Sequence, residues 1–243
     1  MRLLLIRHGD PDYVNDSLTE TGFHEAEYLA ERIARLNVAE YYVSPLGRAM
    51  DTAAPTLRKA GRRAVICDWL QEFSIPIRRP DKHGEMSRVP WDWLPQDWLR
   101  DPQLLDPTIW CRNSVLQESN VGKEYDRVIM EFDSLLAKHG YVRDGLNYRV
   151  ENANSDTLVF FSHFGLCCVL LSHLMNCSPV ILWHGICMAP TSVTTIYTEE
   201  RRTGIASFRA QSIGDISHLY AKGAEPSFAA RFCEVHGNGD RID

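Results

Sequence analysis

Arg7, His8 and Gly9 directly follow a short apolar run at residues 3–6. A buried strand that ends in this triplet would bring an imidazole and a guanidinium together to the rim of a sheet, and the glycine lets the backbone turn freely. An imidazole nucleophile beside a fixed positive charge suits attack on a phosphoryl group, which is electrophilic but surrounded by negative oxygens. The alternative is a plain strand end with a solvated Arg and His, and three residues alone do not decide between the two.

A second histidine has the same local setting much later in the chain. Residues 157–161 form another continuous apolar run, which leads into Ser162-His163-Phe164-Gly165. Runs that are apolar throughout, without alternation, are typical of strands buried on both faces of a sheet. Because ligand sites in α/β sheets lie at the carboxyl ends of the strands, we expect His8 and His163 to share one edge.

Strand and helix patterns alternate along most of the chain. The further expected elements are strands at 41–43, 64–67, 192–197 and 205–213, and helices at about 20–36, from about 46, and over 124–139. Pro55 is expected to kink or end the second of these helices near Ala54. This order predicts an α/β fold with three αβα layers, a mostly parallel sheet with helices on both faces, and an inserted cap region.

Residues 76–122 interrupt the alternation with six of the twelve prolines and four of the six tryptophans. We therefore predict one domain over residues 1–243 with a Trp/Pro-rich insertion at about 76–122. The insertion is expected either to form a lid whose basic and aromatic side chains select a ligand, or to be a small cluster of packed tryptophans. The two hypotheses are compatible, because a lid also needs a core.

The composition limits the classes of partner. The 243-residue chain has 44% hydrophobic and 24% charged residues, as expected for a globular protein with a sizeable core. Its net charge of −6 argues against a general nucleic-acid surface, although a local basic pocket for an anion is compatible with it. No apolar stretch approaches the length of a membrane span. The seven cysteines are an odd number without a CxxC pair, which favours reduced thiols in a cytoplasmic protein.

Five short motifs occur in a fixed order along the chain. They are Arg7-His8-Gly9, Leu18-Thr19-Glu20-Thr21-Gly22, Ser44-Pro45-Leu46-Gly47-Arg48-Ala49 with Thr52-Ala53, Leu70-Gln71-Glu72, and Ser162-His163-Phe164-Gly165. In these motifs the chain resembles the histidine phosphatase superfamily, which contains cofactor-dependent phosphoglycerate mutases and many small-molecule phosphatases. The resemblance covers roughly residues 1–75 and 120–220.

The resemblance implies a phosphoryl-transfer site that needs no metal and no cofactor. His8 would be the nucleophile, attacking phosphorus in line and becoming phosphohistidine. Arg7 and Arg48 would hold the equatorial oxygens, because a guanidinium matches phosphate with two parallel hydrogen bonds. His163 would stabilise charge in the transition state, either protonated or as a neutral donor.

The resemblance leaves the proton donor and the neutral phosphate ligands open. Glu72 matches the family's acid, and its apolar neighbours are expected to raise its pKa if they cover it. Asp10, next to the triplet, is a rival acid. Many family members carry Thr or Ser and then an Asn after the triplet, whereas this chain departs from that pattern. Three possibilities are left open for the neutral phosphate ligand: Asn15 binds phosphate, Ser17 binds it, or neither of them does.

The predicted function is hydrolysis of a phosphomonoester of a small metabolite through a phosphohistidine intermediate. The resembled mutases carry Asn-Glu-Arg-x-Tyr-Gly around the acid, whereas this chain has Gln71-Glu72-Phe73-Ser74, so a mutase is the alternative. A catalytically impaired phosphate-binding or regulatory module is a third hypothesis. The expected partner is a small phosphorylated substrate, with neither nucleic acid nor membrane, and a homodimer stays open.

Overall fold

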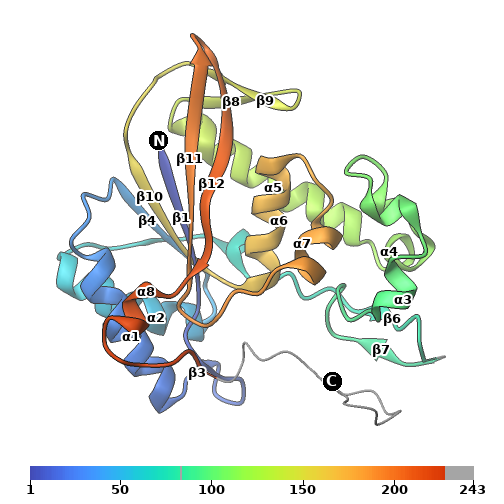
Figure 1. Ribbon diagram of the computed structural model, residues 1–243, viewed down its shortest axis with the longest axis horizontal. Coiled ribbons are helices and arrows are strands. Elements are labelled where there is room, and N and C mark those ends of the chain that lie inside the picture. The colour runs from blue at the N-terminus through green and yellow to red at the C-terminus, as the bar shows by residue number, and fades with distance from the viewer. Residues whose placement is uncertain (83, 228–243) are drawn as a thin grey trace.

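The N-terminal apolar run forms β1 (Arg2–Arg7), a central strand of an eight-stranded sheet (Figure 1). The computed structural model describes residues 1–82 and 84–227. The strands lie in the spatial order β5 (Val65–Ile66), β4 (Glu40–Val43), β10 (Thr157–Ser162), β1, β11 (Val193–Arg202), β12 (Ile205–Asp215), β9 (Asn147–Val150) and β8 (Tyr141–Asp144). The first four strands are parallel and the last four continue the sheet antiparallel. The predicted α/β class is therefore confirmed, with a parallel core inside a mixed sheet.

The register of β1 against β10 decides where the two motif histidines lie. The two strands pair in parallel, with Ile6 opposite Phe161 and Arg7 opposite Ser162. One residue further on, the backbone N–H of His8 still donates to the carbonyl of Ser162. Both strands end at this edge of the sheet, so His8 and His163 follow them side by side, as the sequence predicts.

Helices cover both faces of the sheet (Figure 1). They are α1 (Glu20–Ile33), α2 (Gly47–Ala60) and the short α8 (Ser217–Tyr220) on one side, and α5 (Val121–Lys138), α6 (Phe164–Met175) and α7 (Pro179–Gly185) on the other. Successive side chains of a strand point to opposite faces. Leu4 and Ile6 join the core packed by α1 and α2, whereas Leu3 and Leu5 join the core packed by α5, α6 and α7. The molecule therefore has the predicted three layers.

Helix α2 runs further than its sequence suggests. The expected break near Ala54 is wrong, because the helix continues through Pro55 to Ala60. A proline removes only one helical hydrogen bond, and burial of residues on both sides of it, such as Thr56, holds the last turns against the fold. The helix ends instead at Gly61, whose φ of 63° is the left-handed conformation that glycine adopts readily.

The insertion packs against the α5–α7 side of the molecule. Its elements are β6 (Ile77–Arg78), β7 (Met86–Ser87), α3 (Pro95–Trp98), η2 (Pro102–Leu105), η3 (Trp110–Arg112) and α4 (Ser114–Glu118), preceded by η1 (Asp68–Leu70). Trp110 and Leu116 are buried in the same core cluster as α5 and α6. The ring of Trp91 lies 5.5 Å from that of Trp183 in α7, centroid to centroid. The tryptophans therefore extend the main core.

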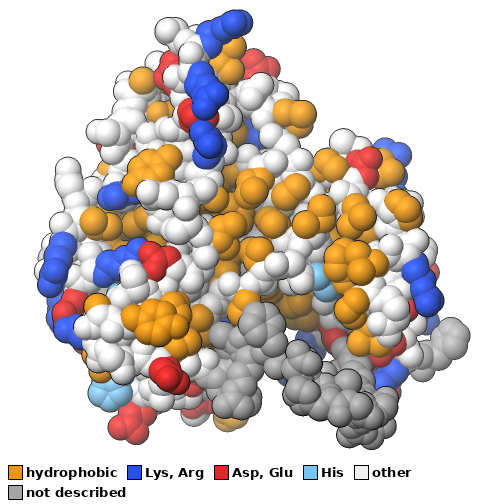
Figure 2. Space-filling view, in the orientation of Figure 1, with side chains coloured by type: hydrophobic (Ala, Val, Ile, Leu, Met, Phe, Trp, Pro, Cys, Tyr) orange, Lys and Arg blue, Asp and Glu red, His pale blue; other side chains and the backbone are white. Residues whose placement is uncertain are grey.

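Figure 2 shows the distribution of side chains over one face. Along the projecting β11–β12 hairpin, arginines are interspersed with glutamates, and hydrophobic side chains gather between this hairpin and α7. Within residues 1–82 and 84–227, no helix combines the length and the apolar character needed to cross a bilayer. Cys167 and Cys168 are buried thiols, and Cys233 lies outside the described residues.

Candidate active site

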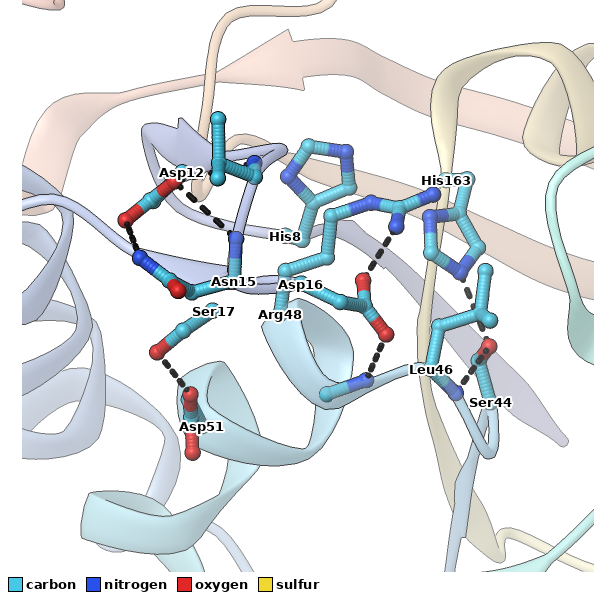
Figure 3. A network of polar contacts seen from close by, with 12 residues as sticks. His8, Asp12, Asn15, Asp16, Ser17, Ser44, Leu46, Arg48, Asp51 and His163 are labelled. Atoms are coloured by element: carbon cyan, nitrogen blue, oxygen red, sulfur yellow. Dashed lines mark hydrogen bonds and ion pairs between the residues drawn. The ribbon is translucent and has the colours of Figure 1, made fainter.

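Two buried histidines form the centre of the site (Figure 3). The rings of His8, after β1, and His163, after β10, lie 5.1 Å apart between centroids and are tilted by 55°. His8 is 2% exposed and His163 is fully buried. Two strands that are distant in sequence but adjacent in the sheet therefore bring both imidazoles to one point.

The hydrogen bond of His8 fixes its tautomer. Its Nδ1 lies 2.7 Å from the carbonyl oxygen of Gly9, which can only accept, so Nδ1 carries the proton and Nε2 has a free lone pair. Burial, followed by the positive charge of Arg7, lowers the pKa of His8 to about 3. His8 is therefore neutral at physiological pH and offers a nucleophilic nitrogen.

His163 is hydrogen-bonded to the protein through its other ring nitrogen, Nε2. Its Nε2 lies 2.8 Å from the hydroxyl oxygen of Ser44, which also accepts the backbone N–H of Leu46. We assign the hydroxyl proton to the bond with Nε2, which leaves the N–H on Nδ1. Burial, together with the nearby His8, Arg48 and Arg7, holds the pKa of His163 well below its usual value. Of the two predicted forms, protonated or neutral donor, this geometry supports the neutral donor.

Two arginines are each held by one terminal nitrogen. Arg7 Nη1 donates to the carbonyl of Met188 at 2.5 Å, and Arg48 Nη1 donates to Asp16 Oδ1 at 2.5 Å. The Nε atoms of both arginines are buried and have no hydrogen-bond partner among the described residues. Since the Nε side of a guanidinium can bind two oxygens of one anion, each arginine is fixed with such an edge still available.

Three of the buried polar atoms that have no partner in the described part of the chain belong to this site: Arg7 Nε, Arg48 Nε and His163 Nδ1. The positive charges of Arg7 and Arg48 both lower the pKa of each histidine. Leaving a buried polar group without a partner costs roughly 1–3 kcal/mol of stability. Several such donors in one place therefore indicate a binding site for a ligand that accepts hydrogen bonds. Guanidinium and imidazole N–H groups of this kind are donors to the oxygens of an oxyanion.

Glu72 lies at the start of α6 beside this cluster. Its Oε1 accepts the backbone N–H of Phe73 at 2.9 Å and of Leu166 at 3.1 Å. Burial raises the pKa of Glu72, although these backbone N–H groups and the charge of Arg7 oppose the shift. Burial therefore favours the protonated carboxyl, which is the form that a general acid needs.

Gly165 lets the insertion approach Glu72. A Cβ at Gly165 would lie 2.1 Å from the ring of Trp91 and 2.9 Å from Glu72 Oε1. Trp91, Gly165 and Glu72 therefore meet at one place, and Trp91 also contacts the ring of Phe164. The insertion thus contributes a tryptophan to the wall beside the candidate acid.

The structure does not bring Asn15 and Ser17 into the cluster (Figure 3). The amide of Asn15 donates to Asp12 Oδ2 at 2.7 Å, and the hydroxyl of Ser17 donates to Asp51 Oδ2 at 2.6 Å. Both side chains are therefore held by carboxylates elsewhere, and the expectation that either binds phosphate is not supported by this geometry.

Asp10, the rival acid, also turns away from the histidines. It lies before the hairpin formed by β2 (Pro11–Asp12) and β3 (Ser17–Leu18). Its Oδ2 accepts the hydroxyl of Thr19, the residue that caps α1, at 2.8 Å. The carboxylate of Asp10 thus anchors the loop to the start of α1.

Two polar contacts of the site were missed in the sequence. Ser44 stands in a quoted motif, but nothing in its neighbourhood indicates that its hydroxyl orients His163. Asp16 lies between Asn15 and Ser17, and its ion pair joins it to Arg48, which is 32 residues away in the chain. No local pattern reports a contact of that sequence separation.

The chain is similar to known proteins over most of its length. The family model described as histidine phosphatase superfamily (branch 1) matches residues 3–211. A 2,3-bisphosphoglycerate-dependent phosphoglycerate mutase from Thermoplasma acidophilum is 30% identical over 94 residues. That alignment covers 35% of this chain and 47% of the mutase, so the chain matches about half of the relative's length.

Solved structures share the fold. A phosphoserine phosphatase variant from Entamoeba histolytica, in complex with phosphoserine, has a TM-score of 0.56 at 18% identity, with 90% of this chain and 98% of that chain covered. A mycobacterial glucosyl-3-phosphoglycerate phosphatase has a TM-score of 0.57 at 19% identity, with 88% and 98% covered. At these identities the likeness concerns the architecture alone.

Proposed function

The chain belongs to the histidine phosphatase superfamily, and on that premise we propose that it hydrolyses phosphomonoesters of small metabolites through a phosphohistidine intermediate. One observation carries the proposal. The free Nε2 of a neutral His8 lies beside three buried, unpartnered donors of Arg7, Arg48 and His163. This combination of a nucleophile and neighbouring donors suits a phosphoryl group, in which charge develops on the equatorial oxygens.

In the first step, His8 Nε2 attacks phosphorus while the bond between phosphorus and the ester oxygen breaks. Glu72 gives its proton to the leaving oxygen, so the product leaves as a neutral alcohol and Glu72 becomes a carboxylate. Arg7, Arg48 and His163 Nδ1 hold the three equatorial oxygens during the transfer. The enzyme is left as phosphohistidine.

In the second step, water attacks the same phosphorus and the bond to His8 Nε2 breaks. The Glu72 carboxylate takes a proton from the water, which restores its acid form. Inorganic phosphate leaves and His8 regains its lone pair. The same two residues thus serve both halves of the reaction.

A phosphoglycerate-type mutase is the second candidate, favoured by the sequence similarity to an archaeal mutase. A mutase must retain its product and return the phosphoryl group to another oxygen. The sequence after Glu72 is Phe73-Ser74, without the Arg, Tyr and Gly of the mutase motif that the chain otherwise resembles. We therefore place hydrolysis first.

The test is product analysis with a panel of phosphomonoesters, p-nitrophenyl phosphate and 3-phosphoglycerate. Hydrolysis predicts release of inorganic phosphate, whereas a mutase interconverts phosphoglycerate isomers without net release. No turnover on any member of the panel would overturn the proposal and favour a phosphate-binding module.

We also propose a cytoplasmic location, supported by the odd set of cysteines without a CxxC pair. The homodimer stays a prediction.

A further inference from the structure

We propose that Asp16 is a positioning residue of the phosphoryl site, which fixes the orientation of Arg48 without touching the substrate. This inference rests on the proposed function, because it assigns a task to Arg48 in phosphate binding. The residue stands where the sequence motifs predict no role, between Asn15 and Ser17 on the β2–β3 hairpin.

Both oxygens of the Asp16 carboxylate bind the first turn of α2 (Figure 3). Oδ1 accepts from Arg48 Nη1 at 2.5 Å, and Oδ2 accepts the backbone N–H of Gly47 at 2.7 Å. One carboxylate therefore grips the backbone and the side chain of two consecutive residues. Such a two-point hold restricts the guanidinium more than a single ion pair would.

The backbone around Asp16 is built for this contact. Asp16 has a φ of 48°, a left-handed conformation that is uncommon for residues other than glycine, although Asp and Asn tolerate it best. A Cβ at Gly47 would lie 2.0 Å from the carbonyl oxygen of Asp16. The hairpin can therefore approach α2 this closely only because residue 47 is glycine.

The contact leaves the useful edge of Arg48 free. Asp16 occupies Nη1, whereas Nε is buried and has no partner in the described part of the chain. The edge that contains Nε can bind two phosphoryl oxygens through two parallel hydrogen bonds. The carbonyl of Met188 likewise accepts from Nη1 of Arg7, whose Nε also has no partner in the described part of the chain. Each arginine is thus oriented by one hydrogen bond from Nη1, which the Asp16 carboxylate accepts from Arg48 and the Met188 carbonyl accepts from Arg7.

A second hypothesis explains Asp16 as a helix cap alone, because its Oδ2 binds the N-terminus of α2. The Asp16→Asn variant separates the two. Asparagine tolerates the positive φ and keeps an acceptor for Gly47, but it carries no charge for Arg48. A matched control is Asp51→Asn, since Asp51 anchors the same hairpin to the same helix through Ser17 and does not pair with Arg48.

We expect Asp16→Asn to lower kcat/KM on p-nitrophenyl phosphate about tenfold or more, as misplaced groups in a site commonly do. Its melting temperature should stay close to that of Asp51→Asn, which should keep wild-type kcat/KM. Equal activity of the two variants would overturn the inference. If wild type itself hydrolyses nothing and binds no vanadate, the proposed function fails, and this outcome is distinct from an active enzyme that tolerates Asp16→Asn.

Vanadate binding, measured by calorimetry, gives a readout that does not depend on turnover. A purely electrostatic role predicts tighter vanadate binding by Asp16→Asn, because a negative charge is removed from the site. A positioning role predicts weaker binding. In an Arg48→Ala background the further effect of Asp16→Asn on vanadate affinity should be less than about twofold, whereas an equal effect in both backgrounds would show that Asp16 does not act through Arg48.

Discussion

The imidazole rings of His8 and His163 lie 5.1 Å apart, and each is hydrogen-bonded to the protein through a different ring nitrogen although both carry their proton on Nδ1. The carbonyl of Gly9 accepts the N–H of His8 Nδ1, so a lone pair stays on Nε2, and the hydroxyl of Ser44 donates to Nε2 of His163, so an N–H stays on Nδ1. The sheet edge therefore presents a nucleophile beside a hydrogen-bond donor. Because burial lowers the pKa of both rings, neither ring needs to be charged before substrate arrives.

Replacing the nucleophile should abolish turnover. We expect His8→Ala to lower kcat by at least about 10³-fold and to form no acid-labile phosphoprotein, because removal of a catalytic nucleophile commonly costs that much or more. The measurement is acid-quench trapping of radiolabelled phosphoenzyme, together with phosphate release. His24→Ala is the matched control, since His24 is exposed on α1 and should leave the rate unchanged. A His8→Ala variant with wild-type rates would remove His8 from the role of nucleophile.

Most of the predicted fold could be derived from the continuous apolar runs in the sequence. The runs before His8 and His163 are buried on both faces, which indicates two central parallel strands and places both histidines at one edge. Pro55 shows the limit of local rules, because packing on both sides of it overrides its tendency to end α2.

The hairpin after Gly9 could not be predicted in the same way. Its residues are polar and close together, so several of them are plausible phosphate ligands by type alone. Asn15 is held within the hairpin by Asp12, three residues before it, but the other two depend on long-range contacts: Ser17 donates to Asp51, and Asp16 pairs with Arg48. No periodicity or local motif encodes such pairings.

If Glu72 is the general acid, the effect of replacing it should depend on the leaving group of the substrate. Glu72→Gln cannot protonate the departing oxygen, so substrates with a poor leaving group should slow by about 10²–10⁴-fold. p-Nitrophenyl phosphate should slow much less, because its leaving group departs without a proton. The check is kcat/KM over a series of aryl and alkyl phosphates, with Asp10→Asn as the rival acid. Equal slowing over the whole series would count against general-acid catalysis by Glu72.

The pH profile should be that of an acid-tolerant enzyme. His8 must be unprotonated to attack, so activity is lost only as pH falls towards its pKa of about 3 in the free enzyme. Glu72 must be protonated to donate, so activity is lost as pH rises through its pKa, which burial holds above the usual value for Glu. We expect kcat/KM for alkyl phosphates to fall on the alkaline side in wild type, and this part of the pH dependence should disappear in Glu72→Gln. A decline of the same size in both proteins would assign it to the substrate.

The ring of Trp91 meets Glu72 across Gly165. If this ring helps to exclude water from the carboxyl, Trp91→Ala should lower the pKa of Glu72 and move the alkaline loss of activity to lower pH. Trp98→Ala is the control, because Trp98 lies in the same insertion but stacks on His184 at 4.7 Å between ring centroids. Both variants remove an indole from the insertion, so a loss of packing alone should affect both. An alkaline loss at the same pH in wild type and in Trp91→Ala would show that the insertion does not control the proton donor.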